Sequence, residues 1–299
     1  MAPLLELRDL SRIYPLGEGG KVHALEHVSL TLNRGETLAI VGESGCGKST
    51  MANLACRLDT PSEGQILLDG EDITHLGPRA LRPHRRKMQM VFQDPFASLD
   101  PRRTVGFTVG EPLIVNGLAK KGAELDELVG KLFERVGLTR NQMRNYPHQF
   151  SGGQRQRICI ARALALKPEL VIADESVSAL DVSVQAQVIN LMMELQAETG
   201  LSYLFITHDL AVVERMAHRV AVMYLGQMVE LGPRRAIFEN PRHSYTKRLL
   251  DAAPIADPRQ RRERKLLVGD IPSPVWAHGQ SPERVALEEV GAGHWVARE

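Results

Sequence analysis

A glycine-rich segment with one lysine carries the strongest chemical signal in the sequence. It fits the pattern GxxxxGK[ST], in which glycines let successive backbone N–H groups turn inward around phosphate oxygens. A helix that begins there would add partial positive charge to the same place. We therefore expect Lys48 to reach the β- and γ-phosphates of a nucleotide and the Ser49 hydroxyl to ligate Mg²⁺. The loop consists of Gly42, Glu43, Ser44, Gly45, Cys46, Gly47, Lys48, Ser49 and Thr50.

Two carboxylates follow the apolar run 170–173. Ligands of open α/β sheets lie at the carboxyl ends of the strands, so these side chains belong at the same end as the phosphate loop. We expect Asp174 to hold Mg²⁺ through water and Glu175 to polarise an attacking water as general base. Acidic residues at a strand end are more often solvated turn residues, but the loop upstream favours the catalytic interpretation.

A third segment, Ser151, Gly152, Gly153 and Gln154, stands directly before a helical run. Its hydroxyl and backbone N–H groups would form a second anion site at a helix N-terminus, and a simple helix cap is the alternative role for Ser151. With this segment the chain resembles the ATP-binding subunits of ABC transporters, over about residues 4–250. In that family the Ser-Gly-Gly-Gln segment closes over the γ-phosphate held by the phosphate loop of the opposing subunit.

The resemblance implies roles for four further residues. Tyr14 matches the aromatic residue that stacks on adenine, with a core aromatic as the alternative. Gln93, at the entry to a helical segment, matches the glutamine that senses Mg²⁺ and the γ-phosphate. Asp181 matches the loop that crosses the dimer interface, and His208 matches the histidine that contacts the γ-phosphate.

The elements that must position these residues form an α/β pattern. Short apolar runs at 37–41, 88–92, 170–173 and 203–206 alternate with helical periodicity, which is typical of a parallel sheet with crossover helices. Helical spacing dominates residues 94–166.

Pattern and resemblance together predict an α/β P-loop NTPase fold of the ABC nucleotide-binding type. We expect an ATPase domain over 4–250, a helical subdomain inserted at 94–166, and a short C-terminal tail at 251–299.

Composition excludes several other classes. The 37 Lys and Arg residues nearly balance the 36 Asp and Glu residues, so bulk charge does not attract nucleic acid. The apolar stretches are much shorter than the roughly 18 residues of a membrane-spanning helix, and the first ten residues lack a secretory pattern, so we expect a cytosolic protein.

The basic run 259–265 has two interpretations, a solvated linker or a contact with anionic lipid.

Finer resemblance points to the ATPases of dipeptide and oligopeptide importers, through the segments 90–102, 146–151, 240–246 and 269–274. This branch implies a peptide cargo, with nickel, glutathione or an opine-like compound as alternatives, and ATP and Mg²⁺ as cofactors. Many relatives bind an iron–sulfur cluster through cysteines near the C-terminus. Residues 276–299 hold no cysteine, so we expect no such cluster.

The same resemblance implies the partners and the location. We expect a heterodimer with a sister ABC ATPase subunit, or a homodimer in isolation, on the cytoplasmic face of the inner membrane. Two transmembrane permease subunits and an extracytoplasmic substrate-binding protein would complete the system, with no nucleic acid.

Two other classes of protein stay open. A soluble ABC ATPase acting on DNA or ribosomes generally carries two nucleotide domains or a long coiled-coil insertion, and neither pattern occurs in this sequence. A small-molecule phosphotransferase would use the phosphate loop without needing Ser151 or Gln154.

Overall fold

A computed structural model describes residues 2–16, 20–252, 275–276, 280 and 282–298. The chain divides into two compact units. Unit 1 comprises residues 1–4, 32–37 and 75–206, and unit 2 comprises residues 5–31, 38–74 and 207–299. The basic run 259–265 and the segment 269–274 lie outside the described residues.

Unit 1 contains a parallel sheet in the order β8-β7-β6. Strand β7 (Leu170–Asp174) lies between β6 (Met88–Val91) and β8 (Ser202–Ile206). Register pairs Met88 with Leu170 and Leu170 with Ser202. Every residue of β7 and β8 is buried, as expected for parallel strands covered on both faces. The predicted strands are therefore present within about one residue of their expected bounds.

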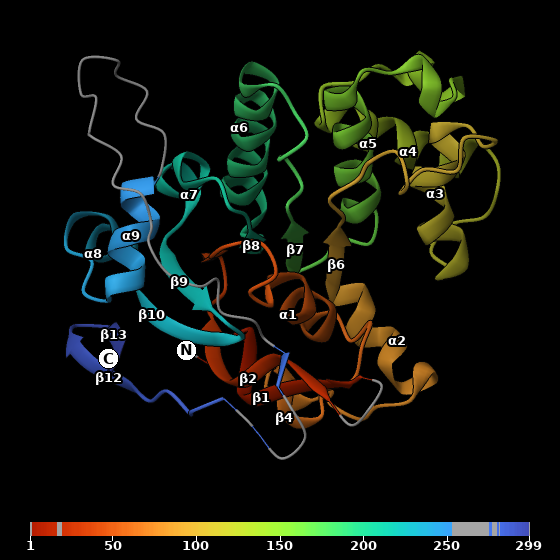
Figure 1. The fold of residues 1–299 in the computed structure, drawn as a ribbon. Helices are drawn as coiled ribbons and strands as arrows, with labels where there is room; N and C mark the ends of the chain where they lie inside the picture. The colour runs from red at the N-terminus through yellow and green to blue at the C-terminus, as the bar shows by residue number, and fades with distance from the viewer. Residues whose placement is uncertain (1, 17–19, 253–274, 277–279, 281, 299) are drawn as a thin grey trace, which may run out of the picture. The chain divides into compact units, whose positions relative to one another are not determined.

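The rest of unit 1 is mainly helical (Figure 1). Helix α3 packs against α4 and α5, and its N-terminus is capped by the Thr104 hydroxyl, which accepts a hydrogen bond from the Phe107 N–H group. Residues 94–166 thus hold three helices and two 3₁₀ turns; their boundaries as a subdomain stay a prediction. The helical elements are α2 (Pro78–Lys87), α3 (Val105–Val115), α4 (Ala123–Arg135), η2 (Arg140–Arg144), η3 (Pro147–Gln149), α5 (Gly152–Leu164) and α6 (Val182–Thr199).

Unit 2 contains an antiparallel sheet in the order β11-β2-β1-β4-β5. Buried and exposed residues alternate along much of β2, where Leu25, Val28 and Leu30 face the core. The pairing of β1 with β4 aligns Leu5 with Leu68. The strands are β1 (Leu5–Pro15), β2 (Lys21–Leu32), β4 (Glu63–Leu68), β5 (Glu71–Asp72) and β11 (Val275–Trp276).

A second group of strands in unit 2 runs in the order β12-β13-β10-β9-β3. Strand β3 (Thr37–Val41) is parallel to β9 (Arg219–Tyr224), and β9 is antiparallel to β10 (Gln227–Pro233). The hairpin of β12 (Leu287–Gly291) and β13 (His294–Ala297) pairs with β10, so this part of the tail belongs to a sheet.

The helices of unit 2 are short. Helices α8 and α9 pack against β10 (Figure 1). Tyr245 and Leu249 lie on α9. In the described part of unit 2 the helices are α1 (Lys48–Ala55), α7 (Leu210–Met216), α8 (Arg234–Glu239) and α9 (Ser244–Ala252). Among the helices of the described residues, none combines the length and apolar content that crossing a membrane requires.

Candidate functional site

The predicted phosphate loop lies in unit 2, between the end of β3 at Val41 and the start of α1 at Lys48. Lys48 is buried, and its Nζ atom donates hydrogen bonds to the carbonyl oxygens of Gly42, at 2.8 Å, and Glu43, at 2.7 Å. The ammonium group is therefore held inside the loop by the backbone. Phosphate oxygens would offer it negative charge in place of these neutral carbonyls.

Close packing explains why the loop begins with glycine. A Cβ atom on Gly42 would lie 2.3 Å from the carbonyl oxygen of Met223 on β9, so no other residue fits there without a backbone shift. Burial raises the pKa of the Cys46 thiol, against the opposing effect of the nearby Lys48 side chain, so the thiol is neutral.

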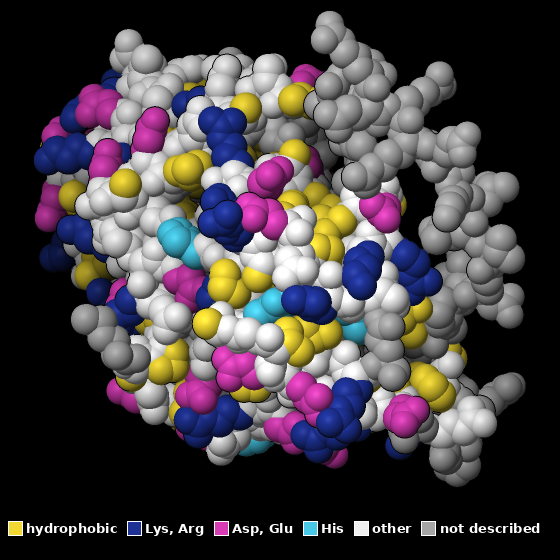
Figure 2. Space-filling model, turned by 90° about the vertical axis from the view of Figure 1, so that its left-hand side faces the viewer, with side chains coloured by type: hydrophobic (Ala, Val, Ile, Leu, Met, Phe, Trp, Pro, Cys, Tyr) yellow, Lys and Arg dark blue, Asp and Glu magenta, His cyan; other side chains and the backbone are white. Residues whose placement is uncertain are grey.

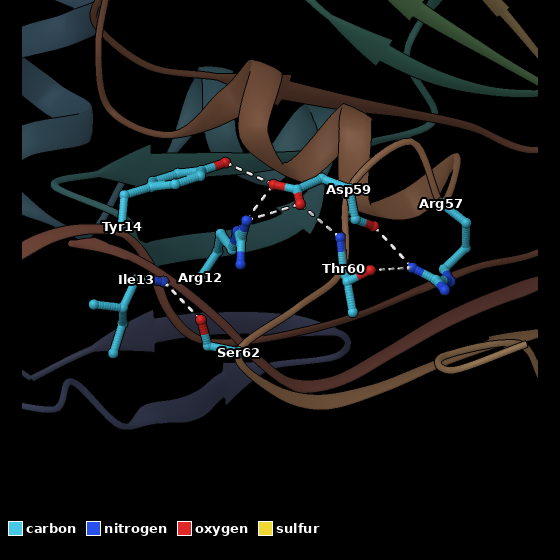
Figure 3. A network of polar contacts seen from close by, with 7 residues as sticks. All are labelled: Arg12, Ile13, Tyr14, Arg57, Asp59, Thr60 and Ser62. Carbon is cyan, nitrogen blue, oxygen red and sulfur yellow. Dashed lines mark hydrogen bonds and ion pairs between the residues drawn. The ribbon is translucent and has the colours of Figure 1, made fainter. Parts of the chain in front are cut away.

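Tyr14, also in unit 2, is held by polar contacts at the end of β1 (Figure 3). Its hydroxyl donates a hydrogen bond of 2.8 Å to Asp59 Oδ2, and the Arg12 guanidinium lies 4.5 Å from the centre of its ring. Arg12 also forms a bidentate ion pair with Asp59, at 2.8 and 2.9 Å. The half-buried ring is therefore fixed at its hydroxyl and covered by a cation on one face.

Asp59 is the residue that organises this network, and sequence patterns gave no signal for it. Burial disfavours its charged form, but hydrogen bonds from Tyr14 and the Thr60 N–H group, together with the charge of Arg12, outweigh that effect and lower the pKa of the carboxyl group. Arg57 supports the same turn, because its Nη1 atom donates to the Asp59 carbonyl oxygen at 2.9 Å (Figure 3).

In unit 1, the predicted general base is in contact with the predicted sensor glutamine. Gln93 Nε2 donates a hydrogen bond of 2.8 Å to Glu175 Oε2, across 82 residues of sequence. Asp174 is buried at the last position of β7, and Glu175 follows it with a left-handed φ of 45°. Its N–H group donates to the Ile206 carbonyl oxygen at 2.9 Å, which fixes the backbone on which the carboxylate stands.

The Ser-Gly-Gly-Gln segment forms the N-terminus of α5 in unit 1. The Ser151 hydroxyl accepts a hydrogen bond from the Gln154 N–H group at 3.3 Å, and the Ser151 N–H group donates to Gln154 Oε1 at 3.0 Å. These reciprocal bonds form a capping box. A Cβ atom on Gly153 would lie 2.2 Å from Val184 Cγ1, so a glycine lets α5 approach α6 closely. The helix-cap role of Ser151 is present, and it leaves the anion-binding role open.

Two predicted residues remain, one at the start of a helix and one in a loop. Asp181, in unit 1, is the N-cap residue of α6. His208, in unit 2, lies two residues after the end of β8 and precedes Asp209, whose carboxylate accepts hydrogen bonds from two N–H groups at the start of α7. Among the described residues, there is no group of three or more His, Cys, Asp or Glu side chains placed to hold a metal ion.

One contact of the phosphate loop was missed by sequence reasoning. Tyr245, in the segment 240–246, accepts a hydrogen bond of 3.0 Å from the Glu43 N–H group through its hydroxyl oxygen. The segment resembles a family motif, but its spacing from the loop indicated no contact.

Comparison with known families decides what these features belong to. The family model described as ABC transporter matches residues 25–178, which include the phosphate loop, Gln93, Ser151–Gln154 and Glu175. The chain belongs to the ABC transporter family. A second family model, described as the C-terminal region of oligopeptide/dipeptide transporters, matches residues 229–278 and includes Tyr245. The resemblance to peptide-importer ATPases is thereby confirmed.

Two curated relatives are similar along almost the whole chain. The glutathione import ATP-binding protein GsiA of Salmonella paratyphi A is 54% identical over 99% of this chain and 48% of its own length. GsiA of Escherichia coli K12 has the same identity and coverage. The chain thus spans about half the length of the curated relatives it matches.

Solved structures agree with the fold. The ATP-binding cassette MJ0796, in a dimeric post-hydrolysis state bound to ADP and Pi, superposes with a TM-score of 0.71 and 33% identity over 77% of this chain and 99% of that one. The cbiO1 protein of Clostridium perfringens, part of the ABC transporter complex cbiONQ, gives a TM-score of 0.71 and 28% identity over 80% of this chain and 92% of that one. The predicted ABC-type P-loop fold is confirmed.

Proposed function

We propose that this chain binds ATP with Mg²⁺ and hydrolyses it as a nucleotide-binding subunit of an ABC importer. The observation that carries the proposal is the occurrence, in one chain, of a phosphate loop around the buried Lys48 and a Ser151 cap in a Ser-Gly-Gly-Gln segment. Residues 4–250 would form the ATPase domain, with 94–166 as its helical subdomain and 251–299 as a tail specific to this branch.

The side chains proposed for the site offer the ligand types that a magnesium nucleotide needs. Ser49, Asp174 and Gln93 offer hydroxyl, carboxylate and amide oxygens, the hard ligands that Mg²⁺ prefers. Gln93 donates a hydrogen bond to Glu175 through its amide nitrogen. The amide oxygen of Gln93 is therefore the atom that could ligate Mg²⁺. Bound Mg²⁺ would neutralise charge on the β- and γ-phosphate oxygens.

Hydrolysis then follows from the roles of the protein groups. Lys48 stabilises negative charge on the β- and γ-phosphates, and Glu175 accepts a proton from the water that attacks the γ-phosphorus. The bond from the γ-phosphorus to the bridging oxygen breaks, and ADP and inorganic phosphate leave. Tyr14 would stack on adenine with the ring face opposite Arg12, and His208 would contact the γ-phosphate.

The proposed assembly is a head-to-tail dimer with a sister ATPase subunit, bound to two permease subunits and served by a substrate-binding protein. Ser151, Gly152, Gly153, Gln154 and Asp181 would act on the nucleotide of the opposing subunit. The MJ0796 cassette is dimeric in its post-hydrolysis structure, which supports the dimer in this proposal. We place the subunit on the cytoplasmic face of the inner membrane, as the family resemblance implies.

The proposed cargo is a peptide. The C-terminal region matched at 229–278 supports peptide cargo in general, and the relatives named as glutathione import proteins favour glutathione within that class. Nucleic acid is disfavoured by the near-zero net charge of +1. On the face drawn in Figure 2, basic and acidic side chains of the described residues are interspersed rather than separated.

Two substitutions test the ATPase proposal. Lys48→Ala should abolish detectable nucleotide binding, because the cation that faces the phosphates is gone. Glu175→Gln should keep binding and accumulate an ATP-bound dimer with the sister subunit, visible by size-exclusion chromatography. A Glu175→Gln chain that hydrolyses ATP at the wild-type rate would overturn the assignment of the general base.

The cargo is tested by measuring uptake in cells that lack redundant importers and whose only copy of this protein carries Lys48→Ala. We expect loss of labelled glutathione or dipeptide uptake at unchanged protein abundance. The cargo whose uptake depends on Lys48 identifies the system, and uptake of both at the wild-type rate would exclude a peptide importer.

A further inference from the structure

The phosphate loop is held from outside by the side chain of Tyr245, 202 residues away in sequence. The bond involves the peptide group that joins Gly42 to Glu43. Its N–H donates to the Tyr245 hydroxyl oxygen at 3.0 Å, and its carbonyl oxygen accepts from Lys48 Nζ at 2.8 Å. In a trans peptide these two groups point in opposite directions. A bond to one of them therefore fixes the direction of the other, which is the one that contacts Lys48.

Tyr245 is itself fixed in place. Its side chain is buried, and its ring packs against Tyr224 of β9 with the ring centres 4.3 Å apart. Burial raises the pKa of the phenol, so the hydroxyl is neutral at physiological pH. The Tyr245 N–H group donates to His243 Nδ1 at 3.1 Å, which links the tyrosine to the turn before α9.

That turn is anchored on Glu230, a carboxylate of β10 with no exposed surface. Glu230 Oε1 accepts from the Arg242 N–H group at 2.8 Å, and Oε2 accepts from the His243 N–H group at 3.1 Å. His294 Nε2, on the C-terminal hairpin, lies 2.7 Å from Glu230 Oε1. Each of these polar contacts joins buried or partly buried atoms of unit 2.

We propose that Tyr245 is a positioning residue for the phosphate loop, and that Glu230 and His294 hold it there, so that the C-terminal segment sets the affinity of the loop for nucleotide phosphates. Tyr245 touches neither phosphate nor Lys48. It acts by orienting the carbonyl group of Gly42 and thereby the lysine. The inference rests on the proposed function of this loop in binding ATP.

The test compares Tyr245→Phe with Tyr224→Phe in the full chain. Both remove one hydroxyl from the same pair of packed rings, but the Tyr224 hydroxyl has no hydrogen bond to another described residue. Titration with a fluorescent ATP analogue in Mg²⁺ should give a Kd raised about fivefold in Tyr245→Phe, the effect of one lost hydrogen bond, and unchanged in Tyr224→Phe. Equal Kd values for the two variants would overturn the proposal.

Thermal unfolding with and without nucleotide distinguishes a purely structural role of Tyr245 from positioning of the phosphate loop. A purely structural role would lower the melting temperature of the free protein but leave unchanged the increase caused by a fixed, subsaturating concentration of MgATP analogue. Positioning of the loop instead predicts a smaller increase at a fixed subsaturating concentration, because that increase depends on affinity. If Tyr245→Phe lowers the melting temperature of the free protein but shows the same increase with nucleotide as wild type, the proposal is wrong.

The hairpin is tested by His294→Leu and His294→Gln. Leucine removes the polar contact with Glu230, whereas glutamine keeps an N–H donor of similar reach. We expect weaker nucleotide binding in the leucine variant and partial or full recovery in the glutamine variant. Wild-type affinity in His294→Leu would remove the hairpin from the proposal.

Lys48→Ala, measured in the same titration, separates this inference from the proposed function. If Lys48→Ala loses nucleotide binding and Tyr245→Phe binds nucleotide as tightly as wild type, the loop binds nucleotide but is not positioned by Tyr245. If Lys48→Ala binds as tightly as wild type, the nucleotide site itself is misassigned.

Discussion

The hydroxyl of Tyr14 donates a hydrogen bond of 2.8 Å to Asp59, while the Arg12 guanidinium covers one face of the same ring. The ring proposed to stack on adenine is thus oriented by a carboxylate 45 residues away in sequence. Stacking on adenine depends on the aromatic ring of Tyr14, whereas the orientation of that ring depends on its hydroxyl group. The two contributions can therefore be separated by substitution.

Tyr14→Phe keeps the aromatic face and loses the bond to Asp59, so we expect about a threefold weaker affinity for ATP. Tyr14→Ala also loses stacking and should weaken ATP binding by about tenfold or more. Affinity for free inorganic triphosphate, which has no adenine, should be the same in both variants as in wild type. Equal ATP affinity in wild type and Tyr14→Ala would contradict the stacking role.

Asp59 makes stability depend on pH. Its pKa in the folded chain lies below the ordinary value of 3.8, because hydrogen bonds and Arg12 outweigh the effect of burial. A lowered folded-state pKa stabilises the fold above the unfolded-state value and loses that contribution as pH falls through the folded-state pKa. Wild type should therefore melt above Asp59→Asn at neutral pH, and the difference should shrink below about pH 4. A difference that is constant down to pH 3 would argue against this account.

The contact between Gln93 and Glu175 gives a prediction on the rate of hydrolysis. Gln93→Glu would place a second carboxylate where the amide nitrogen now lies 2.8 Å from Glu175 Oε2. A carboxylate cannot donate this hydrogen bond and repels Glu175, so it would displace the proposed general base. We expect the ATPase rate of Gln93→Glu to fall by about tenfold or more.

Gln93→Met is the matched control for that experiment. It removes the amide without adding charge, so it should lower the ATPase rate less than Gln93→Glu does. If the two variants hydrolyse ATP at the same rate, repulsion of Glu175 does not affect hydrolysis.

Local patterns were enough to predict the parallel strands and the motif residues. Strands β3, β7 and β8 are continuous apolar runs because both of their faces are buried, and such runs are visible in sequence. The phosphate loop and the Ser151 capping box depend on residues within a few positions of each other. Their local geometry can therefore be predicted from spacing, and their chemistry stays a proposal.

Non-local contacts were beyond prediction. Strand β12 has the sequence LEEVG, and its place depends on β13, which in turn pairs with β10. Asp59 meets Tyr14 across 45 residues and Tyr245 meets Glu43 across 202 residues, with no periodic signal that links them. These contacts arise only when the strands and turns between them have packed.

The two roles of Ser151 can be separated because aspartate caps helices as well as serine does. Ser151→Ala removes the acceptor for the Gln154 N–H group and should lower the free energy of unfolding by about 1 kcal/mol. Ser151→Asp should keep the stability, since its carboxylate accepts the same bond and favours the positive end of the helix dipole.

The same aspartate would repel a γ-phosphate, whereas alanine would only lose a donor. We therefore expect Ser151→Asp to have lower ATPase activity with the sister subunit than Ser151→Ala, although it is the more stable variant. Chemical denaturation and steady-state hydrolysis, measured on the same preparations, give the two rankings. Activity that follows stability, with the aspartate variant near wild type, would reduce Ser151 to a helix cap and remove it from the nucleotide site.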